Sequence, residues 1–276
     1  MSSGSMASID GGNYRFLQDY VYSRAGIVLD SNKHYLFESR LSPVARQFGL
    51  ETVNELCVLL REGREVEVGR HVVEAMTTNE TYFFREPGHY DAIRTKLLPR
   101  LRKERPSAGR LRFWSAAAST GQEAYSLAML LREEGLGEGE TQILGTDLST
   151  QVLERARSGR YQQIEVNRGL PASLLVKYFS RLGVDWQLNG EVRRMVQFES
   201  ADLRQSMRLR GPFDLVFCRN VMIYFDAETK KKILRELHGT LARGGWLLLG
   251  GAEPAFGAEE WFEREMVGNV TVYVAR

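Results

Sequence analysis

The chain has few of the features that mark out several large classes of protein. Its two cysteines, Cys57 and Cys218, lie far apart and each in an apolar setting, so a disulfide framework and a cysteine-based zinc site are excluded. No apolar run approaches the about 20 residues needed to cross a bilayer. The net charge of +2 is too small to argue for nucleic-acid binding. These absences favour a reduced, cytoplasmic protein.

Metal and dinucleotide sites are also poorly supported. Of the four histidines (His34, His71, His89 and His238), none shows metal-ligand spacing, so we expect surface or helix residues and no bound metal. The Gly-x-Gly-x-x-Gly pattern that holds a pyrophosphate is missing, which argues against a dinucleotide cofactor.

Two kinds of hydrophobic periodicity divide the 276 residues. Helical spacing runs through residues 10–76 and predicts a small all-α domain. Residues 77–110 form a linking segment with a basic helix from Pro87 to Arg105, whose charges we interpret as a solvated face. Residues 111–276 alternate strand and helix, which is typical of an α/β fold.

The α/β part is expected to end in a reversed strand and to carry a small insertion. Strands are expected near 111–117, 142–147, 195–199, 213–218, 245–250 and 270–275, and helices near 122–132, 149–158, 171–179 and 227–241. The insertion, near 178–196, contains Asn189-Gly190, a two-residue hairpin signal, and therefore predicts a small β-subdomain.

The stretch from Leu111 to Leu148 resembles the first half of a nucleotide-binding sheet. A buried strand is followed by the small residues 118–121, where the backbone can approach a ligand closely, and then by a helix. The second strand ends in Asp147, the place where ribose hydroxyls are held in such folds. An N-cap role for Asp147 in the next helix is about as probable from this segment alone.

Three more short segments carry candidate site residues. Thr77 to Glu86 combines threonines and Asn79 with two phenylalanines and Arg85; helix caps and core packing explain all but the arginine. Glu123 begins a helix, where the macrodipole stabilises an acid in any protein. A buried strand delivers Arg219 and Asn220 to the carboxyl edge of the sheet, where ligands bind.

Together these segments resemble the CheR family of chemoreceptor glutamate methyltransferases, which use S-adenosylmethionine. Four motifs occur in order: TTNxTxFFRE from Thr77, WSAAxSTGxE from Trp114, TDL from Thr146, and FDxxFCRNVxIYF from Phe213. The resemblance covers nearly the whole chain. It implies a class I methyltransferase sheet, a Rossmann-like α/β fold with a small β-subdomain, preceded by an all-α domain.

The resemblance also implies roles for individual residues. Positions that match cofactor contacts are Asn79, Thr81, Arg85, Glu123, Asp147, Asp202, Leu203, Arg219 and Asn220. Arg85 also matches the position beside the substrate carboxylate, and is the candidate catalytic residue. Gln122 stands where the family commonly has an acid and Ala124 where it commonly has proline.

Partners follow from the same resemblance. Arg40 and Arg46 match the arginines with which the N-terminal helix meets the helical bundle of the receptor, although Pro43 between them suggests a kink or a later helix start. The insertion looks shorter than in members that dock a receptor pentapeptide, which favours a tether-independent enzyme. We expect a monomer, and the basic segment leaves room for a regulatory protein partner.

The implied chemistry needs no general base. A glutamate carboxylate is ionised at neutral pH and is itself the nucleophile toward an activated methyl group. The enzyme has to hold its oxygen in line with the sulfur–methyl bond at about 3 Å. Two rivals remain, since fold does not fix substrate: a small-molecule carboxyl methyltransferase, and a regulatory module that only binds S-adenosylmethionine.

Overall fold

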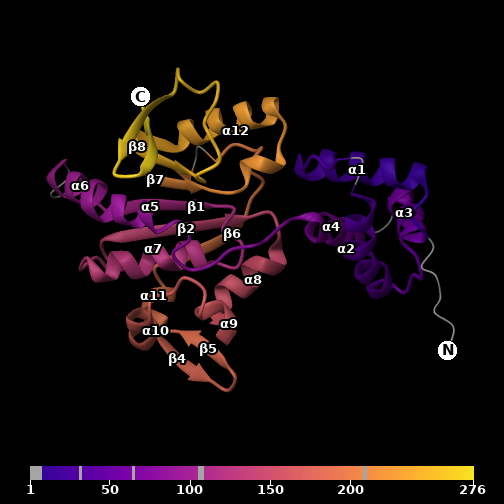
Figure 1. The fold of residues 1–276 in the computed structure, drawn as a ribbon, viewed down its shortest axis with the longest axis horizontal. Helices are drawn as coiled ribbons and strands as arrows, with labels where there is room; N and C mark the ends of the chain where they lie inside the picture. Colours follow the sequence, from indigo (N-terminus) through magenta and orange to yellow (C-terminus); the bar gives the residue numbers. More distant parts are fainter. Residues whose placement is uncertain (1–7, 31–32, 64–65, 105–108, 208–209) are drawn as a thin grey trace. The chain divides into compact units, whose positions relative to one another are not determined.

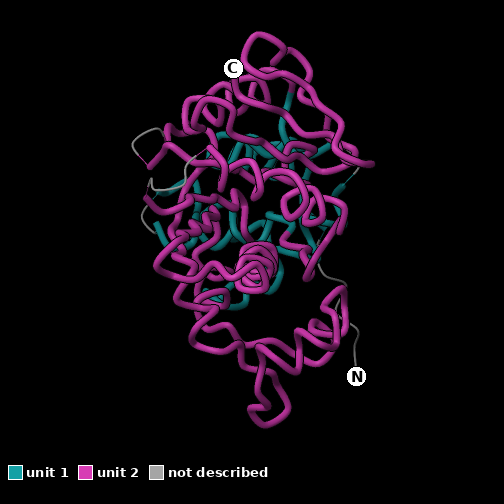
Figure 2. Tube along the Cα trace, turned by 90° about the vertical axis from the view of Figure 1, so that its left-hand side faces the viewer, with its two compact units in different colours: residues 1–78, 224–226 teal, residues 79–223, 227–276 magenta. Residues whose placement is uncertain are grey.

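The computed structural model describes residues 8–30, 33–63, 66–104, 109–207 and 210–276. It separates into two compact units, which Figure 2 colours separately. The first contains the chain up to Thr78 together with Tyr224–Asp226, and the second contains Asn79–Ile223 and Ala227–Arg276. The segment predicted as a linker therefore belongs, from Asn79 on, to the second unit.

The first unit is all-helical. Its helices are α1 (Gly11–Ala25), α2 (His34–Gln47), α3 (Val53–Glu62) and α4 (Val66–Met76). Asp10 caps α1 by accepting a hydrogen bond from the Asn13 amide, and Gly26 ends it in the left-handed conformation, with φ of 72°. Pro43 lies inside α2, which begins well before it at His34, so the predicted later start is wrong.

A helical stretch leads into the sheet of the second unit. It comprises α5 (Pro87–Ala92), the π-helical turn η1 (Ile93–Leu97) and α6 (Leu98–Glu104), which agrees with the predicted helix up to Glu104; Arg105 lies outside the described residues. Not all of its basic side chains are solvated, because the Arg100 guanidinium donates to the carbonyl of Gly244.

Seven strands form the main sheet (Figure 1). They are β1 (Leu111–Ala116), β2 (Thr141–Asp147), β6 (Val196–Ser200), β7 (Phe213–Cys218), β8 (Leu241–Leu249), β9 (Phe262–Val267) and β10 (Val270–Ala275). Their order is β6-β2-β1-β7-β8-β10-β9, and β10 runs antiparallel to both neighbours. This is the predicted methyltransferase sheet with its late reversed strand.

Strand β9 was not among the predicted strands. Its sequence alternates charge rather than hydrophobicity, with Glu263, Arg264 and Glu265 all exposed at the edge of the sheet. Charged side chains are a common protection of edge strands against further pairing, and they remove the hydrophobic signal by which a strand is recognised.

The sheet is buried on both faces, as parallel sheets are. Phe113, Ile143 and Leu248 point into one large core cluster, whereas their neighbours Trp114 and Leu144 are buried outside that cluster. The other helices that the structure describes are α7 (Gln122–Glu133), α8 (Thr150–Ser158), α9 (Gln163–Val166), α10 (Ala172–Tyr178), α11 (Gly190–Arg193), the 3₁₀ turn η3 (Met222–Tyr224), whose last residue belongs to the first unit, and α12 (Ala227–Thr240).

The small β insertion is present as a three-stranded antiparallel sheet. It contains β3 (Arg160–Tyr161), β4 (Phe179–Leu182) and β5 (Asp185–Leu188), in the order β3-β5-β4 (Figure 1). The predicted hairpin turn is wrong: β4 and β5 are joined at Gly183-Val184. Asn189 instead has an extended backbone and occupies the N-cap position of the short helix α11.

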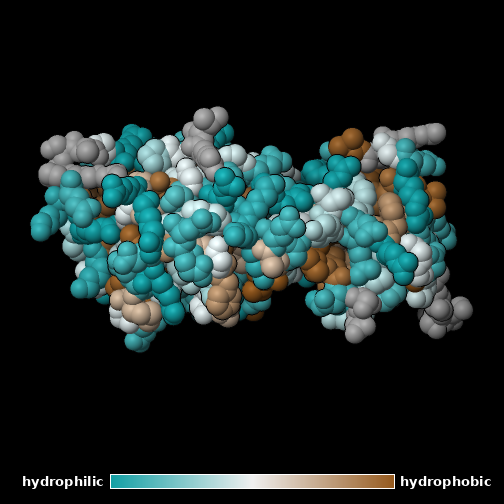
Figure 3. All heavy atoms as spheres, turned by 90° about the horizontal axis from the view of Figure 1, so that it is seen from above, coloured by the Kyte–Doolittle hydropathy of each residue, from teal (hydrophilic) through white to brown (hydrophobic). Residues whose placement is uncertain are grey.

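No helix in the described part of the chain is long and apolar enough to cross a membrane. The face drawn in Figure 3 is mostly hydrophilic, with hydrophobic residues in small groups.

The tight approach of β2 to its neighbours predicts a stability effect at Gly145. A Cβ atom there would lie 2.5 Å from the Phe198 ring, so Gly145→Ala should destabilise the protein by about 1–3 kcal/mol through overpacking. Urea unfolding measures the loss. Gly139→Ala is the matched control, because its Cβ would meet nothing within 4 Å; equal stability of the two variants would contradict the prediction.

Candidate functional site

The candidate site lies where β1, β2 and β7 end. Ala116 pairs with Thr146 of β2 on one side and with Cys218 of β7 on the other. The loops after these strands therefore emerge side by side at the carboxyl edge of the sheet, where ligands bind in open α/β folds. The sheet brings Asp147 and Asn220 to the same edge, although they are far apart in sequence.

Backbone strain is concentrated in the loops at this edge. Among the described residues, the non-glycine positions with positive φ are Phe84, Glu86, Ala117, Ser119 and Asn220. Such a conformation costs an L-residue of order 1–3 kcal/mol and persists only where the surroundings hold it. All five belong to the second unit, and the contacts that hold them define the site.

Asp147 holds the loop after β1. Its buried carboxylate accepts hydrogen bonds from the amides of Ser119, at 2.8 Å, and Ser149, at 3.0 Å. The N-cap of α8 is Ser149, whose hydroxyl accepts from the Val152 amide, so the N-cap alternative for Asp147 is wrong.

Asp202 and Leu203 follow β6, the strand next to β2. The Ala201 amide donates to the Asp147 carbonyl at 3.0 Å, which brings this loop beside the tip of β2. The carboxylate of Asp202 accepts from the guanidinium of Arg204, with a shortest distance of 2.7 Å. Asp202 and Leu203 are both half-buried.

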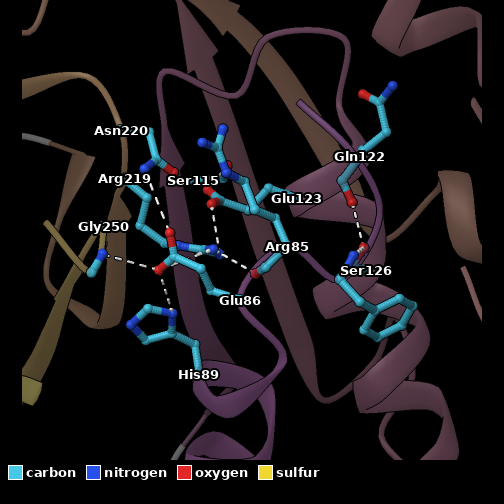
Figure 4. Close-up of polar contacts among 12 residues, drawn as sticks. Arg85, Glu86, His89, Ser115, Gln122, Glu123, Ser126, Arg219, Asn220 and Gly250 are labelled. Atoms are coloured by element: carbon cyan, nitrogen blue, oxygen red, sulfur yellow. Dashed lines mark hydrogen bonds and ion pairs between the residues drawn. The ribbon is translucent and has the colours of Figure 1, made fainter. Parts of the chain in front are cut away.

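Arg219 is an internal residue (Figure 4). Its side chain is 1% exposed and lies 3.2 Å from the carboxylate of Glu123 and 3.6 Å from that of Glu86. It also donates to the backbone carbonyl of Arg85. The predicted cofactor contacts of Arg219 and Glu123 stay predictions, because the structure shows these two side chains bound to each other.

The charges in this cluster are tuned by burial. Burial raises the pKa of Glu123, and the Arg219 guanidinium opposes that rise. The Ser115 hydroxyl donates to the same carboxylate at 2.7 Å and also favours its charged form. A buried carboxylate with one cation and one hydroxyl donor is a positioned group and not a solvated one.

Arg85 lies between the two strained residues Phe84 and Glu86. Its guanidinium is half-buried, donates to the Glu80 carbonyl at 3.2 Å and lies 5.5 Å from the Tyr82 ring. No carboxylate in the described part of the chain pairs with it, so its positive charge is not neutralised by an ion pair there. An anionic substrate group could use this charge.

Asn79 and Thr81 lie nearby in the chain. The Ser119 hydroxyl donates to the Asn79 carbonyl at 2.8 Å, which ties this segment to the loop after β1. Asn79 and Thr81 line a pocket of about 600 Å³ together with Gln122 and Arg155. Arg85, Asp147 and Asn220 are not part of that lining.

Two residues of this cluster were missed by the sequence analysis. The Glu86 carboxylate lies 3.3 Å from the ring Nδ1 of His89 (Figure 4). It also accepts a hydrogen bond from the Gly251 amide at 3.1 Å. His89 is on helix α5 but buried, so the surface alternative for it is wrong. The i, i+3 spacing of Glu86 and His89 at a helix start was the available signal.

The predicted docking arginines differ in their surroundings. The Arg40 guanidinium donates to the carbonyls of Met76, at 3.0 Å, and Thr77, at 2.9 Å, and thus satisfies the end of α4. Arg46, on the same helix, is exposed. Receptor docking by either residue stays a prediction, and Arg40 has an internal role in the helical unit.

Comparison with known proteins decides the family. A family model described as the all-alpha domain of CheR methyltransferase matches residues 12–77, and one described as its SAM-binding domain matches residues 79–270. The chain belongs to the CheR methyltransferase family. The predicted family and fold class are confirmed, and CheR enzymes are S-adenosylmethionine-dependent methyltransferases of chemotaxis.

Relatives match over nearly their full length. Chemotaxis protein methyltransferase Cher2 of Pseudomonas putida is 37% identical over 96% of this chain and 99% of its own. Chemotaxis protein methyltransferase 1 of Pseudomonas aeruginosa is 38% identical over 96% and 98%. A chemotaxis protein methyltransferase of Vibrio parahaemolyticus is 38% identical over 91% and 92%.

The buried His89 predicts a pH dependence of stability. Burial and the nearby Arg219 lower its pKa from 6.5 to about 4, so between these values the unfolded state binds more protons than the folded state. Stability should therefore fall as pH drops from 6.5 to 4, with His89 contributing up to about 3 kcal/mol.

Urea unfolding between pH 7 and pH 4 measures this contribution. His89→Gln should lose less stability than the wild type on acidification, since it removes the group that has to charge. His34→Gln, in the helical unit, is the control. Parallel stability curves for wild type and His89→Gln would refute the assignment.

Proposed function

We propose that this CheR protein transfers the methyl group of S-adenosylmethionine to glutamate side chains in the cytoplasmic helical bundles of chemoreceptors, forming glutamyl methyl esters. The observation that carries the proposal is the strained turn at Arg85, held by the Arg219 cluster at the edge of the sheet that also carries Asp147 and Asn220. The printed names of the relatives, chemotaxis protein methyltransferases, support the same assignment.

The residues at this edge fit S-adenosylmethionine. The carboxylate of Asp147 accepts the backbone amides of Ser119 and Ser149, which fixes its orientation at the tip of β2, where ribose hydroxyls are held in such folds. Asn220, with a donor and an acceptor in one side chain, suits the amino-acid part of the cofactor. When bound, the cofactor supplies a methyl group already activated on a cationic sulfonium.

Arg85 would orient the acceptor. A glutamate carboxylate is ionised at neutral pH, so the protein need not remove a proton from it. The guanidinium of Arg85, which forms no ion pair with a carboxylate of the described residues, can hold one oxygen of the substrate carboxylate by a charge-assisted hydrogen bond while the other oxygen attacks. Two hydrogen bonds fix the backbone of this turn. Arg219 donates to the carbonyl of Arg85, and the Ser126 hydroxyl accepts from the Phe84 amide at 2.9 Å.

Methyl transfer from labelled S-adenosylmethionine to receptor-containing membranes tests the proposal. Label on a receptor-sized band, released by mild alkali as volatile methanol, is expected. Label only in a small-molecule fraction would favour a small-molecule carboxyl methyltransferase. Tight cofactor binding without transfer would favour a regulatory module, and either result would overturn the receptor assignment.

Arg85 is expected to act in turnover more than in cofactor binding. Arg85→Ala should lower kcat about 100-fold, as the loss of one positioned charge does at other active sites. Affinity for S-adenosylhomocysteine should change by only a few fold. Arg85→Lys should recover part of kcat. Arg94→Ala, at an exposed position on the following helix, is the control, and near-wild-type turnover of Arg85→Ala would show that the role is misassigned.

Substitutions of the two candidate docking arginines should affect different properties of the protein. Arg46→Glu should raise the KM for receptor and leave cofactor affinity unchanged, since Arg46 is exposed in the helical unit. Arg40→Ala should instead lower the thermal stability of that unit, because it removes the donor to the last carbonyls of α4. Steady-state kinetics and calorimetry on both variants give the answer, and a reversed pattern would contradict it.

A further inference from the structure

One buried carboxylate joins the carboxyl ends of β7 and β8. Glu253, in the loop after β8, is 5% exposed. Its Oε2 accepts hydrogen bonds from the amides of Asn220 and, at 2.9 Å, of Gly250. Its Oε1 accepts from the Ile223 amide at 3.2 Å. Three backbone donors from two different loops thus converge on one side chain.

Backbone amides, and not a cationic side chain, are the partners of the Glu253 carboxylate. No lysine or arginine among the described residues pairs with Glu253, so its charge is compensated by backbone N–H groups. Burying a carboxylate is costly unless it is hydrogen-bonded in this way. A residue that only filled space at this position would not need a charge.

The backbone that Glu253 holds is strained. Asn220 has φ of 57°, a left-handed conformation that asparagine tolerates better than most non-glycine residues and that the hydrogen bond from its amide to Glu253 holds in place. Gly250 lies so close that a Cβ atom on it would be 2.6 Å from Glu253 Oε2 and 2.7 Å from Asn220 Nδ2. The contact between the two loops therefore depends on both the glycine and the carboxylate.

The same loop reaches the Arg85 turn. The Gly251 amide donates to Glu86 at 3.1 Å, and Asn220 Nδ2 lies 3.5 Å from the other oxygen of Glu86. The loop from Gly250 to Glu253 therefore contacts two of the strained turns of the site. Figure 4 shows Asn220 and Glu86 side by side, next to Gly250.

We propose that Glu253 is a positioning residue of the cofactor site: it holds the Asn220 backbone in its left-handed conformation and thereby directs the Asn220 side chain. The inference rests on the proposed function only in that Asn220 contacts the cofactor. It assigns to Glu253 no contact with substrate or cofactor.

Glu253→Gln is the informative substitution. It keeps the size of the side chain, but both carboxylate oxygens accept backbone N–H groups, so either orientation of the amide places an NH₂ against a donor. Glu259→Gln is the matched control. Glu259 is exposed on the same connection between β8 and β9 and its Oε1 accepts from the Gly257 amide at 3.3 Å, a contact that a glutamine oxygen can keep.

Calorimetric titration with S-adenosylhomocysteine on the full chain measures the effect. We expect Glu253→Gln and Asn220→Ala each to weaken binding at least tenfold, and Glu259→Gln to bind as the wild type does. The double variant should bind no more weakly than the weaker single variant, because one residue acts through the other.

Other outcomes would overturn the inference. Wild-type affinity of Glu253→Gln, or losses that multiply in the double variant, would assign Glu253 no positioning role through Asn220. Absence of binding by the wild type would overturn the proposed function as well, which separates the two failures.

A measurement on the wild type covers the case in which Glu253→Gln does not fold. Amide hydrogen exchange should be slow at Asn220 and Gly250 in the free protein, since both amides donate to the buried carboxylate. Exchange at these two amides as fast as at exposed loop positions such as Phe256 would overturn the inference.

Discussion

The buried guanidinium of Arg219 is the interaction on which the geometry of the site depends. It emerges at the end of β7, contacts Glu123 at the start of α7 and Glu86 at the start of α5, and donates to the carbonyl of Arg85. The Arg219 side chain is 1% exposed, so its charge needs partners inside the protein. Removing one partner of such a buried ion pair is strongly destabilising. Three elements that are distant in sequence are therefore held in one arrangement.

The strained turns follow from this arrangement. Left-handed backbone at Glu86 and Asn220 costs free energy that the Arg219 cluster and the Glu253 carboxylate offset through specific hydrogen bonds. Such turns are more precise than relaxed loops, because each is over-determined by its contacts. A reaction in which the acceptor oxygen has to lie in line with a sulfur–methyl bond gains from that precision.

The acids of the site divide into two kinds by what they bind. Asp147, at the tip of β2, accepts the backbone amides of Ser119 and Ser149. Glu253 is occupied by three backbone amides and Glu123 by Arg219 and Ser115. Carboxylates that look alike in a motif thus differ in whether backbone amides or a buried cation are their partners.

The sequence by itself determined the family, the alternation of strand and helix in the second unit, and some of the residues at the sheet edge, such as Asp147 and Asn220, because hydrophobic periodicity and short motifs are local properties. It did not reveal the charged edge strand β9, the hairpin turn at Gly183, or the internal roles of Arg40 and His89. Only the tertiary structure decided these, since the partners of a buried charge come from distant parts of the chain. The same reason explains why Glu253, remote from every motif, was found only in the folded protein.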